Sequence, residues 1–125
     1  MTSHTLADVK TLIVIPCLNE ARTIEGLLTK FSRTLNHADD RIIVADGGST
    51  DGTPDIVTRF SMRDPRIVLL ANPKRIQSAG INLAIEMFGA GYDYLIRIDA
   101  HGDYPDDYCQ RLLEETMKTG ADSVV

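Results

Sequence analysis

The chain has 125 residues, of which 43% are hydrophobic and 25% charged, and this composition is ordinary for one small globular domain. Its net charge of −5 and the lack of any cluster of Lys and Arg argue against nucleic-acid binding. The apolar runs are far shorter than the ~20 residues that span a bilayer, and residues 1–5 lack the basic and apolar regions of a signal peptide.

Short apolar runs alternate along the chain with stretches of helical periodicity. Strands are predicted, in chain order, over residues 11–15, 41–45, 66–70, 92–98 and 121–125. Helices are predicted from Ile24 to Leu35, from an N-cap at Thr53, over 77–88, and from Pro105 onward. The helix over 77–88 is expected to bury Ile81, Leu83 or Ala84, Ile85 and Phe88. This alternation predicts an α/β fold of three layers, in which helices cover both faces of a mostly parallel sheet. We expect residues 1–125 to form a single domain.

The carboxyl ends of parallel strands meet at one edge of a sheet, where helix N-termini point at ligands. The first strand ends in Pro16-Cys17-Leu18-Asn19-Glu20, and we expect Pro16 to break the strand pairing. Asn19 and Glu20 could cap the next helix or offer an amide and a carboxylate to a ligand, and the residues alone favour neither. The absence of glycine between residues 11 and 25 argues against a dinucleotide-binding domain with a G-x-G-x-x-G motif.

The second strand ends in Asp46-Gly47-Gly48-Ser49-Thr50-Asp51-Gly52-Thr53. The glycines let the backbone approach a flat group, and Asp46 could accept a hydrogen bond from a base N–H or a ribose hydroxyl. The alternative is a glycine-rich turn with helix-capping side chains. That alternative explains Thr53 and Asp51, but it explains Asp46 less well, because we expect a carboxylate at a strand exit to gain little from turn formation.

The remaining strand ends carry two cations and an Asp–His pair. Lys74 and Arg75 precede a predicted helix, where the macrodipole disfavours positive charge unless a diphosphate lies nearby; solvated basic residues are the alternative. Asp99 could hold a sugar hydroxyl or a metal-bound water, and neutral His101 could ligate a transition metal. Alternatively, Asp99 caps a turn and His101 faces solvent. A His ligand would shift the metal preference from Mg²⁺ toward Mn²⁺.

Taken together, these strand ends resemble the nucleotide-binding half of family 2 glycosyltransferases, which have the Rossmann-like GT-A fold. The matching stretches are Ile13–Pro16 with Asn19-Glu20, Val44–Thr53, Ala79–Asn82 and Asp99-Ala100-His101. They cover nearly the whole chain in the right order. The likeness is greatest to succinoglycan-type exopolysaccharide glucosyltransferases.

The resemblance implies an inverting, metal-assisted transfer of a sugar, with glucose as the candidate, from a UDP-sugar to a growing polysaccharide or a lipid-linked acceptor. The nucleotide-binding residues would be Pro16, Asn19, Glu20, Asp46, Gly47, Gly48, Lys74, Arg75, Asp99 and Ala100. Among them, Asp46 would accept hydrogen bonds from the uracil. Asp99 and His101 would hold a divalent metal, Mn²⁺ or Mg²⁺, on the diphosphate.

The sequence departs from the family pattern in two ways. His101 stands where the family's Asp-x-Asp motif has its last acid. The family's catalytic base lies in the acceptor-binding half, beyond the fourth strand, so we assign none here and expect residues 1–125 to be the donor-binding half of a longer enzyme. The alternative is an inactive nucleotide-sugar binding module. A phospho-receiver domain is disfavoured, because the third strand ends in Leu70-Ala71-Asn72 without a phosphorylatable Asp.

The sequence also predicts where the protein works. Cys17 and Cys109 match no metal-binding spacing, so we expect free thiols in a reducing compartment. We therefore expect a cytoplasmic protein, at the cytoplasmic face of the membrane if full-length, with membrane association only through downstream regions.

Overall fold

The computed structural model describes residues 9–119, which form one parallel sheet flanked by helices. The strands are β1 (Thr11–Cys17), β2 (Arg41–Asp46), β3 (Ile67–Ala71) and β4 (Tyr94–Arg97). The helices are α1 (Ala21–Ser32), α2 (Thr53–Arg63), α3 (Gln77–Phe88) and α4 (Tyr108–Thr119). The strand predicted over 121–125 lies outside the described residues. No helix within residues 9–119 is long and apolar enough to cross a membrane.

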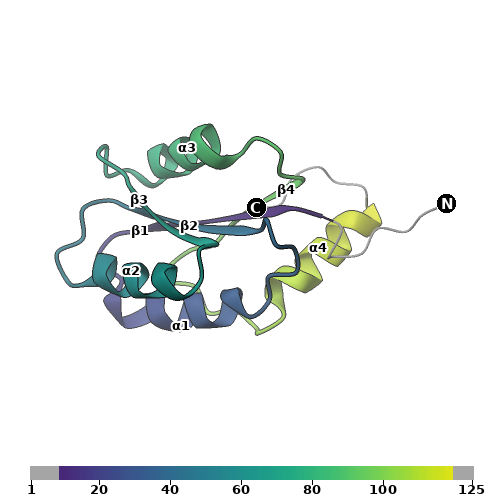
Figure 1. Cartoon of the computed structure of the whole chain (residues 1–125), viewed down its shortest axis with the longest axis horizontal. Coiled ribbons are helices and arrows are strands. Elements are labelled where there is room, and N and C mark those ends of the chain that lie inside the picture. The colour runs from purple at the N-terminus through teal and green to yellow at the C-terminus, as the bar shows by residue number, and fades with distance from the viewer. Residues whose placement is uncertain (1–8, 120–125) are drawn as a thin grey trace.

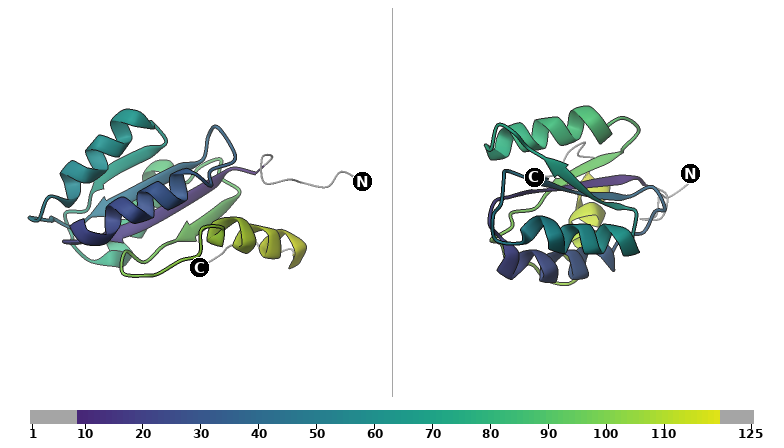
Figure 2. Two further views of the ribbon diagram at one scale, coloured as in Figure 1. Left: turned by 90° about the horizontal axis from the view of Figure 1, so that it is seen from below. Right: turned by 60° about the vertical axis from the view of Figure 1, so that its left-hand side comes forward.

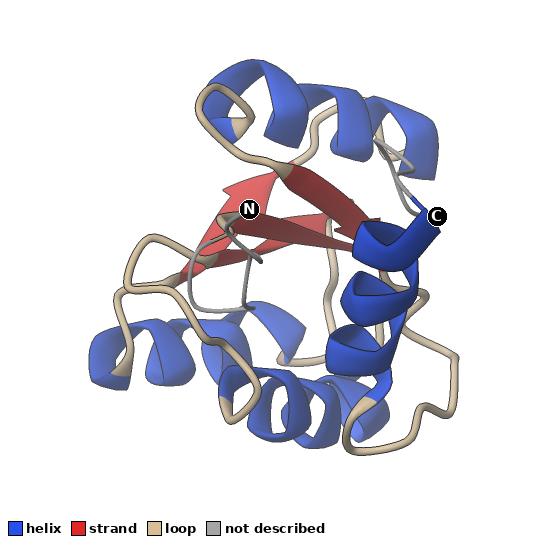
Figure 3. Cartoon of the chain, turned by 90° about the vertical axis from the view of Figure 1, so that its right-hand side faces the viewer, coloured by secondary structure: helices blue, strands red, loops and turns tan. Residues whose placement is uncertain are grey.

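Helices cover both faces of the sheet, which confirms the predicted three-layer α/β/α fold. Successive residues of β1 point to opposite faces. Ile13 and Ile15 join the core beneath α1, α2 and α4, whereas Leu12 and Val14 join a smaller core beneath α3. Figure 1 and Figure 3 show α3 alone on one side of the sheet. Burial on both faces explains why β1 reads as an unbroken apolar run.

The strand order, β3-β2-β1-β4, fixes where the loops meet. From β1 the chain runs outward through β2 and β3 on one side and then crosses to β4 on the other side. The carboxyl ends of β1 and β4 therefore form a topological switch point, where open parallel α/β sheets bind ligands. Figure 2 shows α1 and α2 side by side on one face, so the loops after β1 and β2 also lie next to each other.

Pro16 does not break the pairing of β1 with β2, contrary to our expectation, although the pairing of β1 with β4 ends at Val14. Pro16 lies inside β1 and pairs in register with Ala45 of β2. The carbonyl of Val14 accepts the N–H of Ile98, so Val14 and, two residues later, Pro16 direct their backbone groups toward β4. The N–H that Pro16 lacks would therefore face the end of β4, so the pairing of β1 with β2 does not need it.

Other boundaries differ from the predictions by a few residues. Helix α1 ends at Ser32, and Leu35 packs against the core from beyond the helix. Helix α2 begins at Thr53 with Gly52, at φ 94°, in the N-cap position, so Thr53 is not the N-cap. Helix α4 begins at Tyr108, after a turn in which the Tyr108 N–H bonds the Pro105 carbonyl.

Helix α3 has the predicted bounds, and of its predicted core residues Ala84 is buried and Ile81, Leu83 and Phe88 pack against the core, so only Ile85 differs from the prediction. Ile85 is 41% exposed, whereas Gly80 and Ala84 are buried. A Cβ at position 80 would lie 2.9 Å from the Asn72 amide nitrogen and 3.1 Å from the Ala45 Cβ. The glycine therefore lets α3 lie close to β2 and to the loop after β3.

Candidate functional site

Asn19 ties the loop after β1 to the loop after β2. Its backbone has φ 54°, a left-handed conformation that Asn tolerates better than most residues. Its N–H donates to the Ser49 hydroxyl at 2.7 Å, and its side-chain oxygen accepts the Thr50 N–H at 2.8 Å. The Asn19 side chain thus holds the glycine-rich loop instead of capping α1.

A second set of hydrogen bonds joins the same two loops at the start of α1. The N–H of Glu20 donates to the Thr53 hydroxyl at 3.0 Å, and the N–H of Ala21 donates to Asp51 at 3.0 Å. Asp51 also accepts the hydroxyl and N–H of Thr53, and the hydroxyl bond is the main reason that the pKa of Asp51 is lowered. Asp51 and Thr53 therefore connect the starts of both helices.

Asp46 shapes the glycine-rich loop, and our expectation that its carboxylate gains little from turn formation is wrong. One oxygen accepts the N–H groups of Gly48 and Ser49 at 3.1 and 2.9 Å, and the other accepts the Ser49 hydroxyl at 2.5 Å. Gly48 has φ 101°, which requires glycine. The Asp46 side chain is mostly buried, so these bonds also satisfy a carboxylate that water reaches poorly.

Arg75 packs over the two glycines. Its Nε donates to the Gly47 carbonyl at 2.9 Å, and its guanidinium lies near Gly48, where a Cβ would be 3.6 Å from Nε. Gly47 in turn donates its N–H to the Cys17 carbonyl. The structure thus places Arg75, but not the exposed Lys74, against the predicted nucleoside-binding loop; Lys74 lines a hollow of about 330 Å³ beside α3.

The Asp99-Ala100-His101 segment forms a tight turn after β4. Asp99 accepts the His101 N–H on Oδ1 at 2.9 Å, as the turn-capping alternative predicts. Ala100 is buried against the core, so only its backbone can reach a ligand. The Asp99 N–H donates to the Tyr104 hydroxyl at 3.0 Å.

Glu20 and His101 meet across the switch point. The Glu20 Oε1 lies 2.9 Å from the His101 Nε2, and the two side chains are 10% and 73% exposed. His101 faces solvent, as expected if it is an ordinary loop residue. Its contact with Glu20 nevertheless connects the loop after β4 to the loop after β1. Glu20 occupies the N-cap position of α1 and makes no side-chain capping bond.

Tyr104 is a part of the site that the sequence analysis missed. Besides bonding Asp99, it stacks edge-on against Phe31 at a centroid distance of 5.8 Å, and its carbonyl accepts the Lys30 ammonium. A Cβ on Gly102 would lie 2.4 Å from the Tyr104 ring, so a side chain at position 102 would displace the ring from its observed position. A glycine two residues before an aromatic residue, Gly102 before Tyr104, was the signal available in the sequence.

The side chains at the end of β4 could supply only part of the coordination shell of a metal ion. Within residues 9–119, no group of three or more His, Cys, Asp and Glu side chains could hold a metal ion. Asp99 and His101 can supply one oxygen and one nitrogen ligand. Two protein ligands suffice where phosphate oxygens and water complete the coordination shell. The mixed donors favour Mn²⁺ over Mg²⁺.

Both cysteines are free and buried, which confirms the prediction of free thiols. Burial raises the pKa of each to about 12, and for Cys17 the carboxylates of Asp46, Glu20 and Asp51 add to this effect. A thiol with such a pKa carries almost no thiolate at neutral pH and is a poor nucleophile. Cys17 is therefore a packing residue beneath the site.

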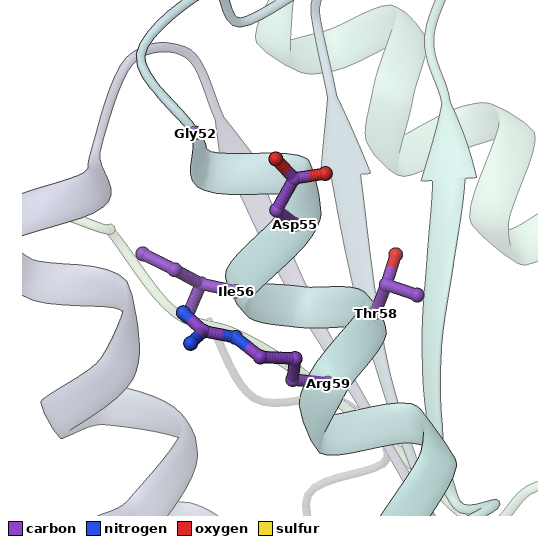
Figure 4. A pocket seen from close by; sticks show the side chains of 5 residues that line it. All are labelled: Gly52, Asp55, Ile56, Thr58 and Arg59. Atoms are coloured by element: carbon purple, nitrogen blue, oxygen red, sulfur yellow. The ribbon is translucent and has the colours of Figure 1, made fainter.

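An open hollow of about 600 Å³ lies along α2. Its lining residues are Gly52, Asp55, Ile56, Thr58 and Arg59, and none of them belongs to the predicted site. Figure 4 shows Ile56 and Arg59 pointing toward α1, with Asp55 and Thr58 on the other side of the helix. The candidate site is thus distinct from this hollow.

The sequence matches a known family over almost its entire length. A family model described as glycosyl transferase family 2 matches residues 12–125. The succinoglycan biosynthesis protein ExoA of Rhizobium meliloti (strain 1021) is 58% identical over 100% of this chain and 38% of that protein. The undecaprenyl-phosphate mannosyltransferase of Micrococcus luteus is 29% identical over 84% of this chain and 43% of that protein. The chain spans less than half the length of these relatives.

Solved structures share the fold. Mannosyltransferase PcManGT from Pyrobaculum calidifontis, in complex with GDP-Man and Mn²⁺, matches with a TM-score of 0.72 and 24% identity over 86% of this chain and 32% of that chain. Glucosyl-3-phosphoglycerate synthase from Mycobacterium tuberculosis, in complex with Mn²⁺, UDP and glucosyl-3-phosphoglycerate, matches with a TM-score of 0.68 and 18% identity over 94% and 45%. These likenesses confirm the predicted Rossmann-like α/β fold.

Proposed function

Because the chain belongs to glycosyl transferase family 2, we propose that it binds a UDP-sugar at the carboxyl ends of β1, β2 and β4 as the donor-binding half of an inverting glycosyltransferase. The observation that carries this proposal is the contact between Glu20 and His101. It joins the loops after β1 and β4 at the switch point, which is where parallel α/β sheets bind nucleotides.

The uridine would lie along Gly47 and Gly48, between the loop after β1 and Arg75. A carboxylate has about four acceptor positions, and Asp46 uses three of them within its own loop. One position remains for the N–H of the uracil. Asp46 would therefore hold the loop and read the base with the same carboxylate, while Pro16 and Asn19 shape the wall of the pocket.

The diphosphate would lie at the end of β4, with Asp99 and His101 holding a divalent cation. When bound, the cation would neutralise the charge that develops on the leaving UDP. The Asp99 backbone, fixed by Tyr104, holds its carboxylate at the strand end. The guanidinium of Arg75 adds a second positive group on the β2 side, with Lys74 exposed beyond it.

The proposed sugar rests on the sequence resemblance to succinoglycan-type glucosyltransferases, and the names of the relatives support the proposed class of acceptor. ExoA is named for succinoglycan biosynthesis, and the Micrococcus luteus relative is named for transfer to undecaprenyl phosphate. We propose glucose as the sugar and a growing saccharide or a lipid-linked saccharide as the acceptor, with the reaction on the cytoplasmic side of the membrane.

Titration calorimetry tests the binding step. UDP should bind in the presence of Mn²⁺ and bind more weakly without it. GDP is the matched competitor, and tighter binding of GDP would overturn the nucleotide assignment. Release of UDP from UDP-glucose in the presence of a saccharide acceptor then separates an enzyme from a binding module. The release assay needs the longer enzyme, because we expect the catalytic base in the acceptor-binding half, and binding without release there would support the alternative of an inactive nucleotide-sugar binding module.

A further inference from the structure

The carboxylate of Glu20 is the fixed partner in its contact with His101. Its side chain is only 10% exposed, and its second oxygen accepts the Thr23 hydroxyl at 3.3 Å. The Glu20 backbone is anchored as well, because its N–H donates to Thr53 and its carbonyl accepts the N–H groups of Thr23 and Ile24. The His101 side chain, 73% exposed, would be free to rotate without this contact.

The contact decides which ring nitrogen of His101 is protonated. An ionised carboxylate has lone pairs but no proton, so the nitrogen that faces it must carry the hydrogen. Nε2 is that nitrogen, at 2.9 Å from Glu20 Oε1. A metal ion needs a nitrogen lone pair, and on an imidazole whose Nε2 is protonated only Nδ1 can offer one.

The backbone of His101 is held in the turn by hydrogen bonds to Asp99. Its N–H donates to Asp99, and the N–H of Gly102 donates to the Asp99 carbonyl. With the backbone held by Asp99 and Nε2 held by Glu20, little freedom is left to the ring. Carboxylates that accept the second N–H of a metal-binding His fix its tautomer and raise its basicity in the same way.

We propose that Glu20 is a positioning residue, which fixes the ring of His101 so that Nδ1 is the nitrogen available to the divalent cation. This inference rests on the proposed function. Glu20 then acts through His101 and does not line the nucleotide pocket directly. The competing arrangement, in which the cation lies between Glu20 Oε1 and His101 Nε2, needs a bare Nε2 and breaks the observed contact.

Nitrogen NMR of the metal-free chain, labelled with ¹⁵N-histidine, tests the tautomer. We expect the His101 ring to carry its proton on Nε2 at mildly alkaline pH. His37 is an internal reference, because its Nδ1 accepts the Asp39 N–H at 2.9 Å and is independent of Glu20. Glu20→Ala should convert His101 to a mixture of tautomers and leave His37 unchanged. A bare Nε2 with a protonated Nδ1 in the parent chain would overturn the inference.

Two substitutions of His101 test the metal-facing nitrogen. The amide of Asn reaches about as far as Nδ1, and the amide of Gln reaches about as far as Nε2. In titrations of Mn²⁺ with UDP present, His101→Asn should therefore retain more affinity than His101→Gln. The reverse order would assign the metal to Nε2 and overturn the inference.

The same titrations measure the role of Glu20. Glu20→Ala should weaken Mn²⁺ binding by about tenfold, within the range seen for such supporting carboxylates. Glu20→Gln keeps the side-chain volume in case the Ala variant unfolds, and it should also weaken binding. Glu114→Ala removes an equal charge from the exposed face of α4 and should have no effect. Failure of the parent to bind UDP with Mn²⁺ would refute the proposed function, whereas normal binding with an unaltered affinity in both Glu20 variants would refute only this inference.

Discussion

The hydroxyl of Tyr104 accepts the backbone N–H of Asp99 at 3.0 Å, and this bond helps to hold the turn after β4. The ring is supported by Tyr108, at a centroid distance of 4.7 Å, and by Phe31. The loop that carries the candidate metal ligands is therefore anchored to α1 and α4 by aromatic packing. Substitutions of Tyr104 should therefore alter the positions of the candidate metal ligands Asp99 and His101 without changing those two residues.

Tyr104→Phe keeps the ring and removes the hydroxyl that Asp99 bonds. The Asp99 N–H is exposed enough to bond water, so we expect a loss of about 0.5–1 kcal/mol in the free energy of unfolding. Binding of Mn²⁺ with UDP should weaken several-fold, because the turn becomes less ordered. Tyr108→Phe is the control, since no described residue bonds its hydroxyl. Equal losses of Mn²⁺ affinity in both variants would show that the Asp99 bond is irrelevant.

Gly102→Ala and Gly26→Ala should change stability in opposite directions. A Cβ at position 102 would lie 2.4–2.6 Å from the Tyr104 ring, so the ring must move, at a cost of about 1–3 kcal/mol. Gly26 lies in the exposed part of α1, where an added Cβ meets nothing within 4 Å, and Ala there should stabilise by about 0.5–1 kcal/mol. Chemical denaturation of the three proteins measures both values. Destabilisation by both substitutions would contradict this account.

Asp46→Ala should disorder the glycine-rich loop and abolish the acceptor for uracil. It removes three hydrogen bonds to a mostly buried carboxylate, so we expect a loss of about 2–3 kcal/mol in stability and at least tenfold weaker UDP binding. Denaturation and titration calorimetry measure the two effects. Ser49→Ala keeps the carboxylate and removes two bonds of the hydroxyl, the one to Asp46 and the one from the Asn19 N–H, so it should affect stability more than UDP binding. UDP affinity as high in Asp46→Ala as in the parent would disprove the assignment.

The alternation of strands and helices was predictable because the residues buried on both faces of the sheet form recognisable apolar patterns in the sequence. Unbroken apolar runs mark strands buried on both sides, and the spacing of Ile24, Leu27 and Phe31 marks one face of α1. The role of Pro16 was not predictable. Which neighbouring strand its missing N–H faces depends on the order of the strands and their register, and the local sequence does not contain that information.

The sequence was sufficient to predict which polar residues gather at the site, but not which partners their side chains contact. The polar strand ends did converge at one edge of the sheet, since parallel strands place their carboxyl ends together. The partners of each side chain depend on the geometry of whole loops. Asp46 bonds its own loop and Glu20 reaches His101 from another strand end, so neither partner can be read from local spacing.

Stability should fall as the pH rises above 9, because of the two buried thiols. Burial raises the pKa of Cys17 and of Cys109 in the folded protein to about 12, from the value of 9.0 for an exposed thiol. Above pH 9 the unfolded chain therefore binds fewer protons than the folded chain, and the stability present below pH 9 is lost progressively toward pH 12. Denaturation curves at increasing pH measure this decline.

Cys109→Ala isolates the contribution of one thiol to this pH dependence. Position 109 is buried in the core that includes α4, so the variant should be less stable than the parent at neutral pH. Its stability should nevertheless fall less steeply above pH 9, because one of the two groups that ionise on unfolding is gone. Alkylation by iodoacetamide gives an independent measurement: both thiols should react only in denaturant. Rapid alkylation of the native chain, or the same pH slope in Cys109→Ala and the parent, would show that the thiols ionise in the folded state.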